Sequence, residues 1–329
     1  MKVILVGGIF GMSNEFRSLN LQVTAETALA TGLRRLGVEV ESQGHRFVNS
    51  IDGADLVHLH HLADSCVQFA LRRRVPLVFT RHATKGIPWH HSRVLAMTYN
   101  RADCVVTLSN AERARLSGVV EDRRIRVIPN GVDSRQFQFV EREAPAHDRP
   151  WRLLYVGQLI ELKRAHLALD LMAYMKASGF AVRLDVVSHR PRLEPELRLR
   201  AARLGLQDNV QFVGPSTQAE ISQWMSRSHS LILPSRTEAL STVVTEACLS
   251  GLPVLAFNVG GIREQLPPSI RTPAVDDLNA FVRSGVRLAT QYRAEVTAYR
   301  AHHAAAAERF SLDAMVLRHL ELYRSLVYR

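Results

Sequence analysis

Short apolar runs rich in valine, isoleucine and leucine alternate along the whole chain with segments of helical periodicity. The first run, KVILVG at residues 2–7, precedes a pattern at residues 24–37 in which leucines recur at helical spacing and Gly37 marks the end. A helix between two strands returns the chain so that both strands run in the same direction. The alternation therefore predicts parallel βαβ units and an α/β fold.

The strand-like runs form two series. The first lies at residues 2–7, 38–40, 55–59, 76–80, 104–108 and 125–128, and the second at residues 151–157, 182–187, 210–214, 230–234 and 253–257. A Pro-Asn-Gly turn ends the first series, and the polar segment EREAPAHDRP, residues 141–150, separates it from the second. A chain of 329 residues has room for two domains of about 150 residues each.

We therefore expect two Rossmann-like, doubly wound domains that face a central cleft, with ligands beyond the carboxyl ends of the strands. The first domain is expected over residues 1–140, a linker over 141–150 and the second domain over 151–308. The last residues, 309–329, show an amphipathic pattern that predicts a terminal helix.

The chain carries 42 lysine and arginine residues against 31 aspartate and glutamate residues, a net charge of +11. A surplus of this size indicates an anionic partner, such as phosphate groups, a nucleic acid or an acidic lipid surface. The positive charge is spread along the chain, without a long basic tail or the aromatic-basic pattern of RNA-binding modules. We therefore expect no nucleic-acid partner and leave contact with an anionic membrane open.

The three cysteines, Cys66, Cys104 and Cys248, are far apart and form no CxxC pair. This pattern favours buried thiols in a reducing cytosol over disulfides or a zinc site. The apolar run at the N-terminus is too short for a signal peptide, and no segment approaches the roughly 20 apolar residues that span a bilayer. We expect a cytoplasmic protein, with peripheral contact to the inner face of the membrane as the alternative.

The stretch VGGIFG, residues 6–11, is close to a dinucleotide fingerprint, but Val6 stands where G-x-G-x-x-G has its first glycine. Gly7 and Gly8 leave two interpretations open, namely a close approach of the backbone to a ligand and a plain turn after a strand.

The stretch HLHHLAD brings His58, His60, His61 and Asp64 close together in the sequence. Alternate residues of a strand share a face, so His58 and His60 would lie side by side. No distant set of ligands completes a metal site, and the chain has no D-x-D motif. We therefore expect no bound metal.

The stretch YVGQLIELKRAH, residues 155–166, places Lys163 six residues after Gly157 and near the start of a predicted helix. A lysine beside the free amides of a helix N-terminus makes a site for an anion. For this motif alone, a solvated surface lysine is the alternative interpretation.

The stretch SRTEALSTVVTEA, residues 235–247, places Glu238 and Glu246 eight residues apart after a predicted strand. If Ser241 starts the helix, the amides of Ser241 and Thr242 are unsatisfied and can take a phosphate. Glu246 then lies about a turn and a half inside the helix, among apolar neighbours. A buried carboxylate is costly without donors, so we expect Glu246 to bind hydroxyl or amide groups of a ligand.

With these residues in view, the chain resembles the GT4 family of retaining glycosyltransferases, which have the GT-B fold. The resemblance rests on the E-x7-E pair, Glu238 and Glu246, and on a series of motifs in order. These motifs are VIPNGVD, YVGQLIELK, NVQFVG, LILPSRTEALSTVVTEA, GLPVLAFNVGGIRE and the terminal ERFSLDAM. It implies a metal-independent enzyme, with no cofactor, that moves a sugar from a UDP- or GDP-type nucleotide sugar to an acceptor hydroxyl. It also implies that the terminal helix crosses back to the first domain.

The resemblance assigns roles to individual residues. Glu246 would bind the ribose hydroxyls, and Glu238 would contact the donor sugar near the reacting carbon. Lys163 would hold the diphosphate, and His82 in VFTRHATKG would contact the donor sugar or support the leaving group. The catalytic residues are thus His82, Lys163 and Glu238, and the donor-binding residues are Gly7, Gly8, Gly157, Gln158, Arg164, His189, Arg190, Leu240, Ser241, Thr242 and Glu246.

The chain departs from the family pattern at several of these positions. Gln158 stands where the family usually has an arginine, so one diphosphate contact is neutral unless Arg164 or Arg236 replaces it. Ser241 replaces a glycine but keeps its backbone amide. The segment HRPRLE replaces a glycine-rich turn, and His189 and Arg190 within it are candidates to line the base pocket.

The acceptor pocket is expected in loops of the first domain. The residues proposed for it are Phe10, Phe16, Trp89, His90 and His91. Such amphipathic side chains suit a sugar, a cyclitol or an aromatic aglycone, and the acceptor is a small molecule, a saccharide or a lipid-linked group. Two other functions stay open, a GT-B nucleotide-sugar-binding protein with weak or no turnover and a non-hydrolysing nucleotide-sugar epimerase.

Overall fold

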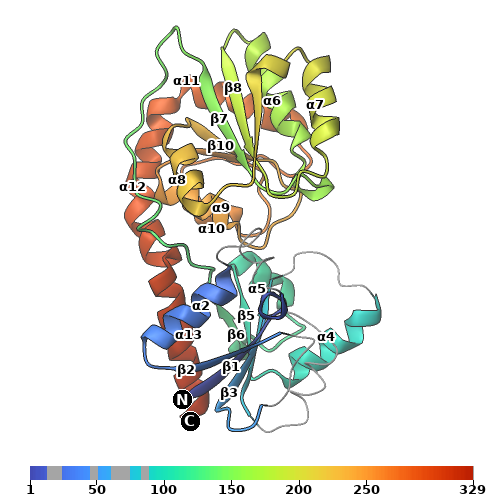
Figure 1. The fold of residues 1–329 in the computed structure, drawn as a ribbon, viewed down its shortest axis with the longest axis vertical. Helices are drawn as coiled ribbons and strands as arrows, with labels where there is room; N and C mark the ends of the chain where they lie inside the picture. Colours follow the sequence, from blue (N-terminus) through green and yellow to red (C-terminus); the bar gives the residue numbers. More distant parts are fainter. Residues whose placement is uncertain (13–23, 45–50, 61–74, 83–88, 329) are drawn as a thin grey trace. The chain divides into compact units, whose positions relative to one another are not determined.

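The computed structural model describes residues 1–12, 24–44, 51–60, 75–82 and 89–328, and for residues 89–94 it describes the backbone only. The chain forms two compact units (Figure 1). Unit 1 comprises Met1–Gly131 and Phe310–Arg329, and unit 2 comprises Val132–Arg309. None of the helices within these described ranges is long and apolar enough to cross a membrane.

Unit 1 is built on a six-stranded parallel sheet of order β2-β1-β3-β4-β5-β6. Its strands are β1 (Lys2–Val6), β2 (Glu39–Gln43), β3 (Leu56–Leu59), β4 (Leu77–Arg81), β5 (Cys104–Thr107) and β6 (Ile125–Val127). The strand order reverses between β1 and β3, which is where doubly wound sheets open a crevice for ligands. The strand predictions for this half of the sequence are confirmed.

Helices and 3-10 turns connect these strands: η1 (Gly8–Gly11), α2 (Ala25–Arg35), α4 (Trp89–Arg101), α5 (Asn110–Leu116) and η2 (Asp122–Arg124). Thr24 and Thr27 form a capping box that starts α2, and Leu29 and Leu33 are buried. Leu36, which continues the helical leucine pattern, is instead 45% exposed because the helix has already ended.

The terminal helix α13 (Leu312–Val327) packs on α2 within unit 1 (Figure 1). Ser311 caps its first turn by accepting a hydrogen bond from the Ala314 amide. The two helices are close because Gly32 has no side chain: a Cβ there would lie 2.4 Å from Val316. Apolar residues of α13 share one core with β1, as Tyr323 and Val316 do with Leu5.

Unit 2 contains a five-stranded parallel sheet of order β11-β10-β7-β8-β9. The strands are β7 (Trp151–Val156), β8 (Val182–Val187), β9 (Val210–Gly214), β10 (Ser230–Leu233) and β11 (Val254–Ala256). The helices and 3-10 turns are η3 (Glu161–Lys163), α6 (His166–Ala177), α7 (Glu194–Arg203), η4 (Gln207–Asn209), α8 (Gln218–Ser226), α9 (Thr242–Leu249), α10 (Ile262–Gln265), α11 (Leu278–Thr290) and α12 (Tyr292–Phe310). The order reverses between β7 and β10, and these two strands carry the motifs described above.

The segment 141–150, which the sequence suggests as a linker, belongs to unit 2. Arg142 is only 9% exposed, and its guanidinium donates to the backbone carbonyls of Ser226, Ser228, Ser250 and Gly251. The polar segment therefore contains a buried arginine that holds it against the rest of unit 2. The division between units falls instead after the Pro-Asn-Gly turn, at Gly131.

Candidate functional site

The motif residues of unit 2 gather at the carboxyl ends of β7 and β10. Gly157 and Gln158 follow β7, and Lys163 ends η3 a few residues later. Glu238 lies in the loop after β10, and this loop leads into α9. Since the strand order reverses between β7 and β10, the loops that follow them diverge and leave room above the sheet for a ligand.

Lys163 and Glu238 form an ion pair within this site. Lys163 Nζ lies 2.5 Å from Glu238 Oε1, and the two side chains are 25% and 10% exposed. The pKa of the nearby Tyr155 hydroxyl is raised by burial and further by the negative charge of Glu238. A partly exposed ammonium thus lies beside a mostly buried carboxylate, and the two can act on a polar ligand together.

Glu246 lies inside α9, and its side chain is buried. The residue is 7% exposed, and within the described part of the chain no hydrogen bond or ion pair is formed by its carboxylate. Burial alone raises its pKa to about 7. A carboxyl group in such a place is stabilised by protonation or by donors that a ligand brings, and the ligand contact of Glu246 stays a prediction.

The N-terminus of α9 differs from the expectation in one respect. Ser241 precedes the helix, as predicted, but its amide donates to Gln265 Oε1 at 3.2 Å. Gln265 Nε2 in turn donates to the Ser241 carbonyl and to Thr245 Oγ1, both at 2.7 Å. The prediction that the Ser241 amide is free was therefore wrong, while the Thr242 amide has no partner among the described residues. Gln265, fully buried, is the residue that sequence reasoning missed.

The backbone around Glu238 is fixed by a glycine from the loop after β11. Gly260 has a φ of +52°, and a Cβ there would lie 1.6 Å from the Glu238 carbonyl oxygen. The next residue, Gly261, donates its amide to the Ala239 carbonyl at 2.9 Å. The two loops are therefore joined through their backbones, and Leu240 is buried beside this junction at 8% exposure.

Arg164, which was expected to bind the donor, is engaged in holding the loop after β10. Its guanidinium donates to the carbonyls of Pro234, Ser235 and Val275, and it stacks 4.5 Å from the centre of the Phe257 ring. Three of its five N–H donors thus serve the backbone, and the assignment of Arg164 to the donor stays a prediction. Arg236, the other arginine expected to compensate for the neutral Gln158, has an exposed side chain.

The loop after β8 is joined to the loop after β7. The Leu159 amide donates to the Arg190 carbonyl at 3.0 Å, while the Arg190 side chain is exposed. His189 Nε2 is buried and has no hydrogen-bond partner among the described residues. Burial, and then the charge of Arg190, lower the pKa of His189, so the ring is neutral and Nε2 can interact with an uncharged group of a ligand.

In unit 1, His82 follows β4 and contacts His60, which follows β3. His60 Nδ1 and His82 Nε2 are 3.1 Å apart, and a carboxylate oxygen of Glu26 lies within 4.8 Å of both rings' ligand atoms. This group has the composition of a metal site, and the sequence did not single out Glu26. A hydrogen bond between the rings accounts for the short distance without an ion.

His58 shares a face with His60, as predicted, and their ring centres are 4.1 Å apart. It is fully buried, with Nδ1 bonded to the Tyr323 hydroxyl and Nε2 to Thr80 Oγ1. Both ring nitrogens are therefore engaged within unit 1, and His58 is a structural residue. His61 and Asp64 lie outside the described residues.

The structure describes the remaining predicted site residues of unit 1 only in part. Gly7 has an extended backbone, and a Cβ there would be in ordinary contact with the Phe10 ring, which packs on the core. Gly8 begins η1 beside them. Trp89, His90 and His91 begin α4, where only the backbone is described, and Phe16 lies outside the described residues.

Two family models match consecutive parts of the chain. Residues 137–270 match the model described as glycosyl transferases group 1. Residues 42–136 match the model described as glycosyltransferase family 4. The first match contains Lys163, Glu238 and Glu246, and the second contains His60 and His82.

Individual proteins that are similar to this chain are also glycosyltransferases. A D-inositol 3-phosphate glycosyltransferase of Streptomyces bingchenggensis is 29% identical over 247 residues, which cover 66% of this chain and 53% of that relative. The chain thus spans about half the length of such curated relatives. A glycosyltransferase of Rickettsia africae has the same fold, with a TM-score of 0.80, 16% identity and coverage of 99% of this chain and 98% of its own. Anabaena HepE, solved with UDP and glucose, has a TM-score of 0.75, 18% identity and coverage of 99% and 100%.

Proposed function

Because the chain belongs to the GT4 family of glycosyltransferases and has the GT-B fold, we propose that it transfers a sugar from a nucleoside-diphosphate sugar to an acceptor hydroxyl. The proposal includes retention of the anomeric configuration and independence of metal ions. It is based on the residues at the carboxyl ends of β7 and β10, since the relatives are only partly covered by this chain.

Glu246 is the single observation that carries this proposal. The Glu246 carboxyl group is buried, has a pKa of about 7 and accepts no hydrogen bond among the described residues. Its oxygens can therefore accept hydrogen bonds from a ligand. The two vicinal hydroxyls of a ribose supply two donors at a spacing that one carboxylate accepts. We therefore assign Glu246 to the ribose of the nucleotide, and its ionised form is the one that the bound ligand favours.

The diphosphate is assigned to Lys163 and to the amide of Thr242. Lys163 is partly exposed, and only one of its three ammonium N–H donors is used on Glu238, so the other two can bind an anion while the ion pair is kept. The Thr242 amide lies at the positive end of α9. Arg236, with an exposed side chain, supplies the charge that Gln158 lacks. The Ser241 amide is left out of this assignment because Gln265 already accepts its hydrogen bond.

These assignments explain how the reaction would be accelerated. Cleavage of the bond between sugar and diphosphate builds positive charge on the sugar and negative charge on the leaving group. Groups that are fixed near the diphosphate stabilise the transition state more than the ground state. Glu238 would bind the donor sugar near the reacting carbon, and His82 of unit 1 is the further residue that we assign to catalysis.

The names of two similar proteins indicate which donors and acceptors to test first. HepE was solved with UDP and glucose, so UDP-sugars are the first donors to test. One relative carries the name of D-inositol 3-phosphate glycosyltransferase, so a phosphorylated cyclitol is the first acceptor to test. The surplus of arginine in this chain agrees with such an acidic acceptor.

A thermal-shift screen tests the donor site directly. UDP, GDP, ADP and their common sugar conjugates are added with and without EDTA to the wild type, Glu246→Ala and Glu295→Ala. Glu295 is a matched control, since it is also a buried glutamate on a helix of unit 2 but pairs with Arg287. A ligand at 100 times its dissociation constant adds about 2.7 kcal/mol of stability.

We expect one nucleotide series to stabilise the wild type and the Glu295→Ala control, with no effect of EDTA and no shift in Glu246→Ala. A shift that disappears with EDTA contradicts metal independence. Absence of any shift in the folded wild type contradicts the donor site itself.

A further inference from the structure

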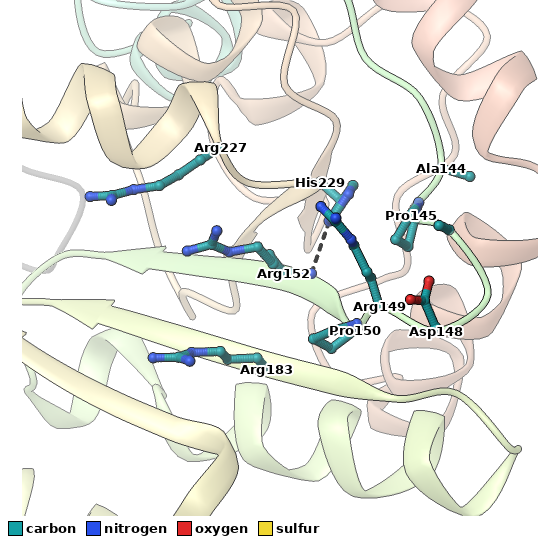
Figure 2. Close-up of a pocket in the computed structure, with 10 residues that line it drawn as sticks. Ala144, Pro145, Asp148, Arg149, Pro150, Arg152, Arg183, Arg227 and His229 are labelled. Carbon is teal, nitrogen blue, oxygen red and sulfur yellow. Dashed lines mark hydrogen bonds between the residues drawn. The ribbon is translucent and has the colours of Figure 1, made fainter.

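A cavity lies in unit 2 at the edge of the sheet opposite to Glu246. It measures about 670 Å³ and lies where β7 and β8 begin and just before β10 begins (Figure 2). Arg152 is the second residue of β7, and Arg183 is the second residue of β8. Because the strands are parallel, their first residues are separated from the loops of the candidate site by the length of a strand. For the six residues of β7 this is about 20 Å.

Positive charge dominates this cavity. Four arginines line it, Arg149, Arg152, Arg183 and Arg227, together with a single carboxylate, Asp148. Figure 2 shows Arg152, Arg183 and Arg227 extended in the same direction from three segments, with Asp148 on the other side. His229 adds no charge, since burial and the nearby arginines lower its pKa to about 4.

A buried carboxylate fixes two of these arginines. Asp185 on β8 is fully buried, and its two oxygens lie 3.6 Å from Arg152 Nη2 and 3.6 Å from Arg183 Nε. Neither oxygen has a hydrogen bond within the described residues. Asp185 therefore attracts both guanidinium groups without occupying their N–H donors, and it holds them side by side.

The donors of the cavity arginines are largely free for a ligand. Within the described residues, neither Arg149 nor Arg152 makes a side-chain hydrogen bond, and Arg152 Nε is buried without an acceptor. The guanidinium carbon of Arg227 lies over the Trp224 ring, 3.8 Å from its centre, and its N–H groups form no hydrogen bond among the described residues. Arg183 uses one nitrogen to donate to Gln211.

We propose that this cavity is a second binding site, for a ligand that carries two or more phosphate groups. A planar guanidinium group can bind two phosphate oxygens with two parallel hydrogen bonds. A volume of about 670 Å³ suits a small molecule or a headgroup rather than a single ion. The site is distinct from the nucleotide-sugar site, and its existence does not depend on the proposed reaction.

Calorimetric titration with inorganic pyrophosphate tests the proposal on the full chain carrying Lys163→Gln, which removes the charge of the proposed diphosphate site so that this site contributes little to the titration. The pocket variant is Arg183→Gln with Arg227→Gln, and the matched control is Arg200→Gln with Arg198→Gln. Arg200 is 44% exposed and pairs with Asp170, as Arg183 is 47% exposed and pairs with Asp185. Arg198 stacks on Phe212 at 4.4 Å as Arg227 stacks on Trp224. Both variants thus remove the same charge and the same kinds of contact.

We expect the pocket variant to bind pyrophosphate about tenfold more weakly than the control, with a difference that shrinks as salt is added. An Arg183→Lys, Arg227→Lys variant keeps the charge and should give an intermediate affinity, which also serves if the glutamine variant does not fold. Equal affinities of the pocket variant and the control would overturn the proposal.

A flotation assay distinguishes a lipid headgroup from a soluble ligand, with phosphatidylcholine vesicles that contain about one fifth cardiolipin, whose headgroup carries two phosphates. Flotation of the wild type and the control, but not of the pocket variant, identifies a lipid headgroup as the ligand. Pyrophosphate binding without pocket-dependent flotation identifies a soluble phosphorylated compound.

Discussion

Glu246 makes stability and ligand binding depend on pH in opposite ways. Its pKa is near 4.5 in the unfolded chain and about 7 in the folded one. Its contribution to stability is therefore fully present below pH 4.5 and is lost as the pH rises through about 7. We predict that Glu246→Gln is about 3 kcal/mol more stable than the wild type at pH 8 and equal to it at pH 4.5. Urea unfolding at the two pH values measures this difference.

The same substitution should lower nucleotide affinity about tenfold or more, because the amide accepts hydroxyl hydrogen bonds more weakly than a carboxylate does. Glu295→Gln is the control, since Glu295 pairs with Arg287 and should leave nucleotide affinity unchanged. A stability difference that is the same at both pH values would show that Glu246 is already ionised in the free protein.

Lys163→Gln should lower kcat about a hundredfold with a smaller change in KM for the donor, since its charge acts most on the leaving diphosphate. The measurement is steady-state kinetics with the donor that the thermal-shift screen identifies. Lys176→Gln provides the matched loss of one lysine in unit 2, where Lys176 donates to the Gly205 carbonyl. Equal kcat values for the two variants would remove Lys163 from the mechanism.

Some residues of the site could be predicted from sequence and others could not. The Glu238 and Glu246 pair and Lys163 were found because each stands at a fixed offset from a recognisable strand. The bonds of Gln265 and Arg164 join positions 24 to 111 residues apart along the chain. Spacing within a segment carries no information on such pairs, so the engaged Ser241 amide and the structural role of Arg164 emerged only from the fold.

The loop after β11 is the element that holds Glu238 in place through its backbone. Gly260→Ala would put a methyl group into the Glu238 carbonyl, so one of the two loops must move. We predict a loss of about 2–4 kcal/mol in stability together with weaker nucleotide binding. Gly205→Ala is the control, because Gly205 also has a positive φ, +63°, but nothing within 4 Å of a Cβ.

Differential scanning fluorimetry with and without nucleotide separates these effects. The control should lose about 1 kcal/mol of stability and keep its nucleotide shift. A Gly260→Ala variant that keeps the wild-type shift would mean that the position of the Glu238 loop does not matter for binding.

Elements were more predictable than their boundaries. Buried parallel strands appear as continuous apolar runs, and each run named in the sequence proved to be a strand. Residues 141–150 looked like a linker because they are polar, yet Arg142 is buried with four backbone carbonyls as acceptors. A buried arginine satisfied only by the backbone leaves no trace in hydrophobic periodicity.

The two units of the molecule differ in whether one or two segments of the chain form them. Unit 2 is one continuous segment, Val132–Arg309, with a core of its own around β7, α6 and α11. Unit 1 needs the last residues of the chain, since Met315, Tyr323 and Leu326 of α13 belong to the same core as β1. Independent folding should therefore be possible for a fragment of unit 2 and impossible for residues 1–131 alone.

We predict that a fragment of residues 132–309 folds cooperatively and binds the nucleoside diphosphate with a dissociation constant within about tenfold of the full chain, because Lys163, Glu238 and Glu246 all lie within it. Circular dichroism during thermal unfolding and calorimetric titration measure the two properties. Truncation of the full chain after Arg309 is the complementary variant. Without α13, the apolar surfaces of Leu29 and Leu33 on α2 lose their cover, so unit 1 should unfold while nucleotide binding persists. Loss of nucleotide binding from a folded 132–309 fragment would show that unit 1 contributes to the affinity for the nucleotide.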